Sequence, residues 1–354
     1  MDTATTLSRP RIRSLAAGVA AMTLVGGSVG VSRTLVAAPL FTAQAIRYAA
    51  ATLVLFAIAR SARIPVPRPR GPEWLWLAGV AASGLVLFNV AIVRGVAHAE
   101  PAVIAVAVAC VPIVLGIIGP LLERQTPRRQ ILLAALAVTA GSGLVEGAGS
   151  TDAVGVAWAA VALLCESAFT LLAVPVLPRH GAWGVSLHSV WIGTVMLAVL
   201  SAVTEGTSAV AGLTAADWAA VAYLAIMVTA VAFVLWYSTV ASLGAGRVGL
   251  LTGIAPVSAA ITGVVMGSRV PGPLVWAGVV VVISGLAVGL WSRPVPGRCG
   301  PSAAAVGMRQ APPRSQMGTA PGTFNRTIAK HRQVRDGPVC DGYDLGLVSD
   351  GEAT

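Results

Sequence analysis

The stretch VACVPIVLGIIGPLLERQTPRRQ, residues 108–130, carries two prolines inside an apolar run, then one carboxylate, Glu123, and then three arginines. A stretch of the same form, IAPVSAAITGVVMGSRVPGPLVWAG, occupies residues 254–278. A shift of 144 residues places one on the other and aligns Pro112 with Pro256, Pro127 with Pro271, and Gly141 with Gly285. The spacing indicates an internal repeat with a proline in the middle of an apolar segment.

The composition places the chain in a membrane. Of its 354 residues, 56% are apolar and 11% are charged, against roughly 25% charged in soluble domains. The mean hydropathy is +0.81. The apolar runs are continuous and rich in Ala, Leu, Val and Gly, and a helix needs about 20 such residues to cross a bilayer. The sequence therefore predicts an all-α integral membrane protein.

Ten transmembrane helices can be read from these runs. The expected spans are residues 15–32, 38–59, 74–94, 101–121, 130–147, 154–176, 184–204, 216–238, 248–267 and 273–291. Small-residue pairs within them are expected to form internal packing faces, because small residues let membrane helices approach closely. These pairs are Gly26/Gly30, Gly143/Gly147, Gly263/Gly267 and Gly285/Gly289.

The net charge of +10 comes almost wholly from arginine, because Lys330 is the only lysine. No basic face is interleaved with aromatic residues, so nucleic-acid binding is not expected. Most arginines precede the first span or follow the even-numbered ones. The opposite loops carry few arginines and hold Glu100, Glu146, Asp152, Glu205 and Asp217. Basic residues are retained in the cytoplasm. We therefore expect a multi-pass protein of the cell membrane with both termini cytoplasmic.

The chain divides into four expected segments. Residues 1–13 form a cytoplasmic N-terminus, 14–150 a first five-helix repeat, 151–292 a second five-helix repeat, and 293–354 a tail rich in Pro, Gly, Ser and Ala. A segment of that composition buries too little apolar area to fold alone, so a disordered cytoplasmic tail is expected. The four scattered cysteines form no C-x-x-C pair, and we expect no metal site.

An odd number of spans per repeat gives the two halves opposite orientations in the membrane. Inverted repeats are a feature of many secondary transporters, in which the halves enclose a site near the midplane. Pro112 and Pro256 lie at matching places in the fourth and ninth spans. A proline there removes a helical hydrogen bond and kinks the axis, so these two residues are expected to shape the helices or to line a cavity.

At this point the sequence resembles the EamA domain of the drug/metabolite transporter (DMT) superfamily. The resemblance rests on a mid-span proline, an apolar stretch that ends in Glu123, and a short basic loop. Supporting stretches are IRYAAATL, LFNVAIVRGVAHAEPAVIAVAVACVP and FVLWYSTVASLGAGRVGLLTGIAP. It covers about residues 14–292 and implies two EamA repeats and export or exchange of metabolites. The second repeat departs from the pattern, with MGSRVPG where the family usually has a glutamate.

Ionisable groups deep in a bilayer are costly and usually functional. Glu166, central in the sixth span, is a candidate for binding an amino group or a proton, or for a structural pairing. Arg47, in the second span, is a candidate for holding a substrate carboxylate or for a structural role at the cavity rim. Further candidates for a cavity are Asn89, Trp191, Trp236 and Tyr237. Glu123 is expected at the cytoplasmic end of its span, paired with a nearby arginine.

The leading functional hypothesis is a secondary transporter that exports a small polar or amphipathic metabolite, such as an amino acid, by alternating access with proton coupling or exchange. An alternative is a multidrug efflux carrier for hydrophobic cations. Alternatives of another class are a non-transporting scaffold and an intramembrane enzyme. Against an enzyme, Ser142 and Ser284 lie beside glycines without a histidine partner. No nucleotide-binding P-loop is present. We expect no enzyme activity, no cofactor, a small-molecule substrate, and a monomer or weak homodimer in the lipid bilayer.

Overall fold

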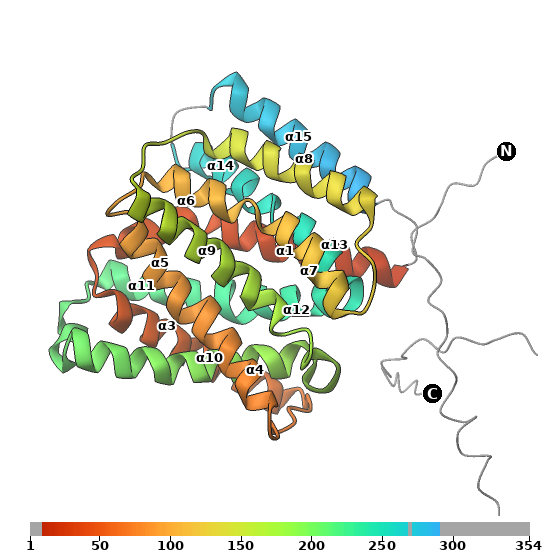
Figure 1. Ribbon diagram of the computed structural model, residues 1–354. Coiled ribbons are helices and arrows are strands. Elements are labelled where there is room, and N and C mark those ends of the chain that lie inside the picture. The colour runs from red at the N-terminus through yellow and green to blue at the C-terminus, as the bar shows by residue number, and fades with distance from the viewer. Residues whose placement is uncertain (1–8, 268–270, 291–354) are drawn as a thin grey trace, which may run out of the picture. The chain divides into compact units, whose positions relative to one another are not determined.

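The computed structural model describes residues 9–267 and 271–290. All regular elements of this part of the chain are helices (Figure 1). The first half contains α1 (Arg9–Gly27), α2 (Val29–Ser32), η1 (Arg33–Ala37), α3 (Leu40–Ser61), α4 (Glu73–Val80), η2 (Ala81–Leu87), α5 (Phe88–Gly95), α6 (Pro101–Val108), α7 (Val111–Leu122) and α8 (Arg129–Glu146). The second half contains α9 (Ala153–Leu171), α10 (Leu177–Thr204), η3 (Thr207–Gly212), α11 (Ala215–Tyr223), η4 (Leu224–Val231), α12 (Ala232–Leu243), α13 (Ala245–Leu251), α14 (Ile254–Val265) and α15 (Pro273–Leu290).

Ten spans account for these elements. Within the described ranges, nine helical stretches are long and apolar enough to cross a membrane. The tenth span is α8, an 18-residue helix whose apolar middle lies between Arg129 and Glu146 at its two ends. The predicted fold class is confirmed for the described residues: they are all-α and form two five-helix repeats, with α8 completing the set of spans. The expected tail, residues 293–354, lies outside the described residues.

Equivalent helices of the two halves pack against each other. The second spans pair as α3 with α10, the fifth spans as α8 with α15, and α7 of the fourth span packs on α13 of the ninth. The remaining contacts are also matched. α1 of the first half packs on α12 and α14 of the second half. Its counterpart α9, in the second half, packs on α5 and α6 of the first half. Figure 1 shows the α3–α10 pair and the α8–α15 pair on opposite sides of the bundle. These matched contacts indicate that a pseudo-two-fold axis relates the two repeats.

The fourth and ninth spans are broken at equivalent places. The first break separates α6 from α7 at residues 109–110, and the second separates α13 from α14 at residues 252–253. Pro112 and Pro256 each fall in the first turn of the helix that follows. A proline is tolerated there because its missing N–H has no helical partner in a first turn. The prolines predicted kinks, and the structure shows a short irregular turn at each place, with the backbone still in the right-handed helical region.

Two spans also contain a wider, π-helical turn at matching positions. η2 occupies residues 81–87 of the third span, and η4 occupies residues 224–231 of the eighth. Such π-turns occur mostly as short insertions in α-helices, frequently at functional sites. They pass without a break into α5 and α12. The sequence pattern did not predict these π-helical turns.

The seam between α8 and α15 is a backbone-to-backbone contact. A methyl group added at Gly141 would lie 2.8 Å from the carbonyl oxygen of Gly278 and 2.8 Å from the amide nitrogen of Val282. Gly285 is crowded in the same way by α8. The expectation of a packing face is wrong for Gly143, because nothing lies within 4 Å of a methyl group placed there. On α8, the glycine in close contact with α15 is Gly141, two residues before Gly143.

Candidate functional site

Two internal cavities adjoin at Glu166. The larger cavity has a volume of about 330 Å³, and a smaller chamber beside it has a volume of about 150 Å³. Both are lined by Met22, Val25, Phe88 and Glu166. Glu166 on α9 and Met22 on α1 therefore lie where the two spaces meet.

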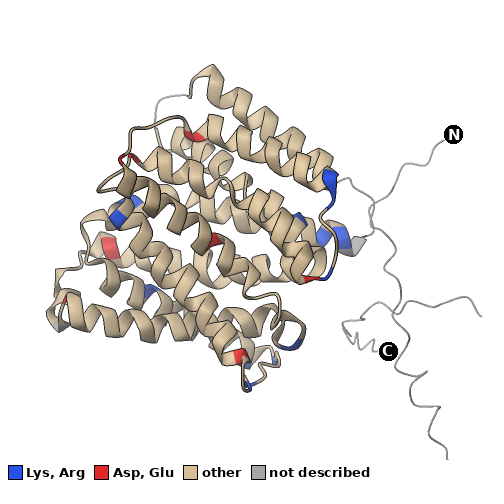
Figure 2. Ribbon diagram, in the orientation of Figure 1, with Lys and Arg blue, Asp and Glu red and all other residues tan. Residues whose placement is uncertain are grey.

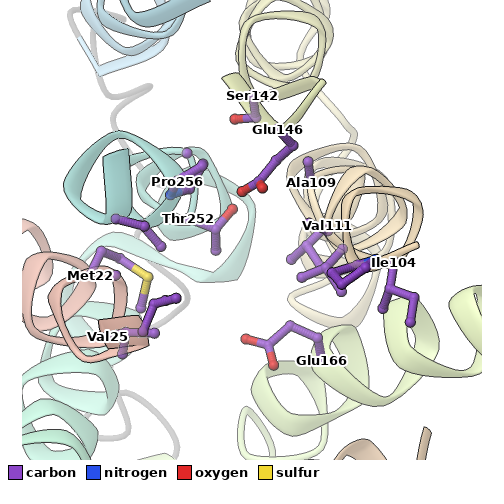
Figure 3. A pocket seen from close by; sticks show the side chains of 18 of the residues that line it. Met22, Val25, Ile104, Ala109, Val111, Ser142, Glu146, Glu166, Thr252 and Pro256 are labelled. Atoms are coloured by element: carbon purple, nitrogen blue, oxygen red, sulfur yellow. The ribbon is translucent and has the colours of Figure 1, made fainter. Parts of the chain in front are cut away.

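The broken helices build the walls of the larger cavity (Figure 3). The first break contributes Ala109, the second contributes Thr252, and Pro256 follows on α14. Most of the lining is apolar, and its ionisable groups are two carboxylates, Glu146 and Glu166. No basic side chain is among the described residues that line it. The larger cavity thus suits a ligand with an apolar body and a positive charge.

Arg47 provides the positive charge of the smaller chamber. Its Nε donates a hydrogen bond to the Thr229 hydroxyl on η4 (2.9 Å), and its Nη1 donates to Oε1 of Gln44 (3.3 Å). Its guanidinium carbon lies 5.2 Å from the centre of the Tyr48 ring. These partners are all neutral, and in the described part of the chain Arg47 forms no salt bridge with a carboxylate. The geometry leaves its charge available to an anionic group.

Asn89 on α5 continues this polar network. Its Oδ1 accepts a hydrogen bond from Nε2 of Gln44 (3.1 Å), and its Nδ2 donates to the carbonyl oxygen of Leu85 (2.7 Å). Leu85 belongs to the π-turn η2, whereas the Thr229 partner of Arg47 belongs to the π-turn η4. The network therefore contacts the irregular turns of both halves.

Two predicted aromatic residues lie at different depths around the chamber. Trp236 lines it, and its indole N–H donates a hydrogen bond to the Thr170 hydroxyl (3.1 Å). Tyr237 is fully buried. Its hydroxyl donates to the carbonyl oxygen of Phe169 (3.1 Å), and its ring packs on that of Phe169 with centroids 5.3 Å apart. Tyr237 therefore supports the wall, while Trp236 forms part of its surface.

The other predicted site residues lie elsewhere. Pro112 is buried at the start of α7. Trp191 donates from its indole N–H to Nδ1 of His188 (3.2 Å), and its ring lies 5.9 Å from that of Trp74. The Oε1 of Glu123 accepts from the backbone N–H of Ala245 (3.0 Å), which caps α13. Glu123 thus connects the end of the fourth span to the start of the ninth.

Equivalent helices of the two halves have the same length but carry different charged residues. α1 and α9 have 19 residues each, and the shift of 144 residues places Met22 on Glu166. The same shift places Arg47 on Trp191 and Asn89 on Phe233. The polar candidate side chains Glu166, Arg47 and Asn89 thus have apolar or aromatic residues at the equivalent positions.

The sequence pattern did not reveal three polar residues of the larger cavity: Thr252 and, on α8, Ser142 and Glu146. Glu146 was placed with the charges of the outer side, but it is the last residue of α8 and lines the cavity. Ser142 has no histidine partner that would make it a nucleophile, yet it lines the same cavity one helical turn from Glu146. The spacing of four residues between them, which places both on one helix face, was the available signal.

Two loops meet at the rim of the larger cavity. The backbone N–H of Glu100 donates to the carbonyl oxygen of Ser150 (3.0 Å), and the Ser150 hydroxyl donates to Oε1 of Glu100 (2.7 Å). These bonds hold the pKa of Glu100 below its usual value. Asp152 accepts from the backbone N–H of Gly155 (2.8 Å) and pairs with His98 (3.0 Å), and these contacts lower its pKa as well. Both carboxylates are therefore charged at neutral pH.

Five-helix repeats around a cavity, with irregular helices in its walls, occur in many membrane transporters. The chain belongs to the EamA-like transporter family, whose family model matches residues 12–146 and again residues 153–291. It is 28% identical over 256 residues to the uncharacterized transporter YetK of Bacillus subtilis (strain 168), covering 70% of this chain and 78% of the relative. A crystal structure of another protein matches with a TM-score of 0.68 at 19% identity over 78% of this chain and 96% of that chain. That second likeness supports the fold.

Proposed function

We propose that this chain is a secondary carrier that exports a small amphipathic solute, an amino acid or a related compound, by alternating access. One observation carries the proposal: Glu166 faces both cavities, and Arg47 supplies an opposite charge in the smaller one. Opposite charges around one enclosed space match a zwitterion. The ammonium group would bind Glu166, the carboxylate would bind Arg47, and the apolar walls would cover the side chain.

The two breaks and the two π-turns support a rocking mechanism. A helix without its regular hydrogen bonds bends more easily, and these four places lie at equivalent positions in the two halves. Glu166 can hold either a proton or the ammonium group of a solute, but not both. This competition is the basis on which we propose proton coupling, with solute exchange as the other mode.

The positions of the arginines support a cell-membrane protein with both termini in the cytoplasm. Figure 2 shows arginines gathered where α1 and α8 begin. Glu100 and Asp152, which form the rim, lie at the other end of the bundle, directly before α6 and α9. The positive-inside rule assigns the basic end to the cytoplasm. The larger cavity then opens toward the outside.

A second candidate function is efflux of hydrophobic cations. The observation that favours it is the lining of the larger cavity, which combines two carboxylates with apolar side chains and includes no basic residue in the described ranges. A cation without a carboxylate would use this cavity and leave Arg47 unused. The two functions therefore differ in their dependence on Arg47.

Flux assays in proteoliposomes separate these functions. Vesicles with an imposed pH gradient would be loaded with a mixture of the twenty amino acids or with tetraphenylphosphonium, and efflux followed by mass spectrometry. We expect efflux of one or more amino acids, reduced about 10- to 100-fold in Glu166→Gln and in Arg47→Met, because each loses a charge-assisted interaction. The control Ser284→Ala, a serine on α15 that bonds its own helix, should transport like the wild type.

Each other outcome points to a different function. Efflux of tetraphenylphosphonium that needs Glu166 but not Arg47 would replace the amino acid proposal with cation efflux. Amino acid efflux that Glu166→Gln leaves unchanged would keep the carrier and reduce Glu166 to a structural residue. The scaffold alternative predicts no flux of either probe by the wild type.

A further inference from the structure

Ser142 and Glu146 form a polar pair on the cavity-facing side of α8. They lie one helical turn apart, and both line the larger cavity (Figure 3). Ser142 is only 1% exposed, and its hydroxyl oxygen has no hydrogen-bond partner among the described residues. A buried hydroxyl without a partner costs roughly 1–3 kcal/mol. That cost is recovered when a ligand supplies the missing partner.

The break between α13 and α14 lies opposite this pair. A methyl group placed on Gly253 would lie 3.4 Å from Oγ of Ser142, so the hydroxyl lies beside the interrupted backbone. The neighbouring Thr252 also lines the cavity. Its hydroxyl donates to the carbonyl oxygen of Gly249 (2.8 Å). Its own proton is therefore used, and its oxygen remains an acceptor.

The carboxylate of Glu146 is also without a protein cation. In the described part of the chain it takes part in none of the salt bridges. It is the last residue of α8, where the negative end of the helix dipole favours a positive charge. Figure 3 shows Glu146 and Glu166 on different walls of the cavity. Glu146 thus offers a separate location for a cation.

Three side chains at this place present oxygen acceptors: Glu146, Ser142 and Thr252. A primary ammonium group has three N–H donors and no acceptor. A quaternary ammonium has the same charge but no N–H donor, and it would leave Ser142 without its partner. The acceptor set therefore selects a primary ammonium over its methylated counterpart.

We infer that Glu146, Ser142 and Thr252 form a second subsite, which binds the primary ammonium group of the solute apart from Glu166. The inference rests on the proposed function, because the solute is the amine that the carrier moves. Val96 and Pro101 line both the larger cavity and the surface hollow that contains Glu100. The subsite lies in the cavity that opens at this rim. An amine that leaves Glu166 would bind here next.

Binding of two probes to the purified full-length protein tests the subsite. The probes are phenethylamine and its N,N,N-trimethyl derivative, which share charge and skeleton and differ in N–H donors. For the wild type we expect tighter binding of the primary amine. Glu146→Gln should weaken its binding about 10- to 100-fold, and Ser142→Ala should weaken it several-fold, as expected for losing a charge-assisted hydrogen bond. Ser142→Ala should leave binding of the trimethyl probe unchanged.

The control is Ser284→Ala, because this serine on α15 bonds its own helix. It should not alter the binding of either probe. Unchanged amine binding in both Glu146→Gln and Ser142→Ala would overturn the subsite and leave Glu166 as the amine site. Equal losses for both probes in Ser142→Ala would overturn the selection of primary ammonium. Failure of the wild type to bind phenethylamine would overturn the subsite, whereas the proposed function stands or falls separately with the amino acid efflux assay. Because Ser142→Ala removes a single buried oxygen, it tests the inference even if Glu146→Gln does not fold.

Discussion

Substituting Gly141 by Ala should force α8 and α15 apart. The added methyl group would lie 2.8 Å from two backbone atoms of α15, the carbonyl oxygen of Gly278 and the amide nitrogen of Val282. Backbone atoms have no rotamer with which to move away, so the helices themselves must shift. Overpacking of this kind costs about 1–3 kcal/mol of stability.

Gly143→Ala is the matched control, two residues away on the same helix. Nothing lies within 4 Å of its added methyl group. Both substitutions gain the same helical preference of Ala over Gly, about 0.5–1 kcal/mol. That gain cancels when the variants are compared. The free energies of unfolding should therefore differ by the overpacking cost alone, about 1–3 kcal/mol, with Gly141→Ala the less stable.

Unfolding in mixed micelles with increasing sodium dodecyl sulfate, followed by circular dichroism, measures this difference. Each variant is fitted for its free energy of unfolding and its midpoint. Equal values for the two variants would refute the reasoning, because they would mean that α8 and α15 do not touch at Gly141. A less stable Gly143→Ala would refute it more strongly, by placing the contact on another face.

Two further predictions concern turns outside the cavities. Gly244→Ala should destabilise the protein by about 1–3 kcal/mol, because Gly244 has φ +79° and ψ 152°, a conformation that is essentially restricted to glycine. Its methyl group would also crowd the carboxylate of Glu123, so unfolding of Glu123→Ala/Gly244→Ala should show less than the sum of the two single losses. Asp152→Ala should lower the melting temperature at neutral pH but much less in acid. The backbone N–H of Gly155 lowers the pKa of Asp152 in the folded state; its contribution is therefore complete above the unfolded pKa of about 3.9 and is lost as the pH falls below it. A gap in melting temperature that stays constant with pH would contradict this.

The fold followed from the sequence because its signals are long and repeated. Runs of about twenty apolar residues fix the length of a span, and the shift that aligns Pro112 with Pro256 fixes the repeat. Both signals survive errors of a few residues at helix ends. The ninth span was expected to begin at residue 248, whereas α13 begins at Ala245. The difference leaves the topology unchanged.

The site followed less completely, because a membrane sequence carries weak information about which face of a helix points inward. Glu166 stood out through its charge in the centre of a span. Glu146 did not, because a carboxylate at the end of a span is ordinary at an interface. Gly143 and Gly141 have the same chemistry, and only the packing of α15 distinguishes them. The roles of the candidate residues in transport remain predictions.

The glycine seam between α8 and α15 has a consequence for motion. Side chains that interdigitate between two helices resist rotation of one helix relative to the other. At Gly141 and Gly278 the backbones of the two helices are in direct contact, without interdigitated side chains between these two residues. The pair α3–α10 lies on the other side of the bundle (Figure 1), and there Glu205 accepts hydrogen bonds from the backbone N–H groups of Phe41 and Thr42. Around these residues, the α3–α10 side is held by side-chain-to-backbone hydrogen bonds, whereas the α8–α15 side packs backbone against backbone.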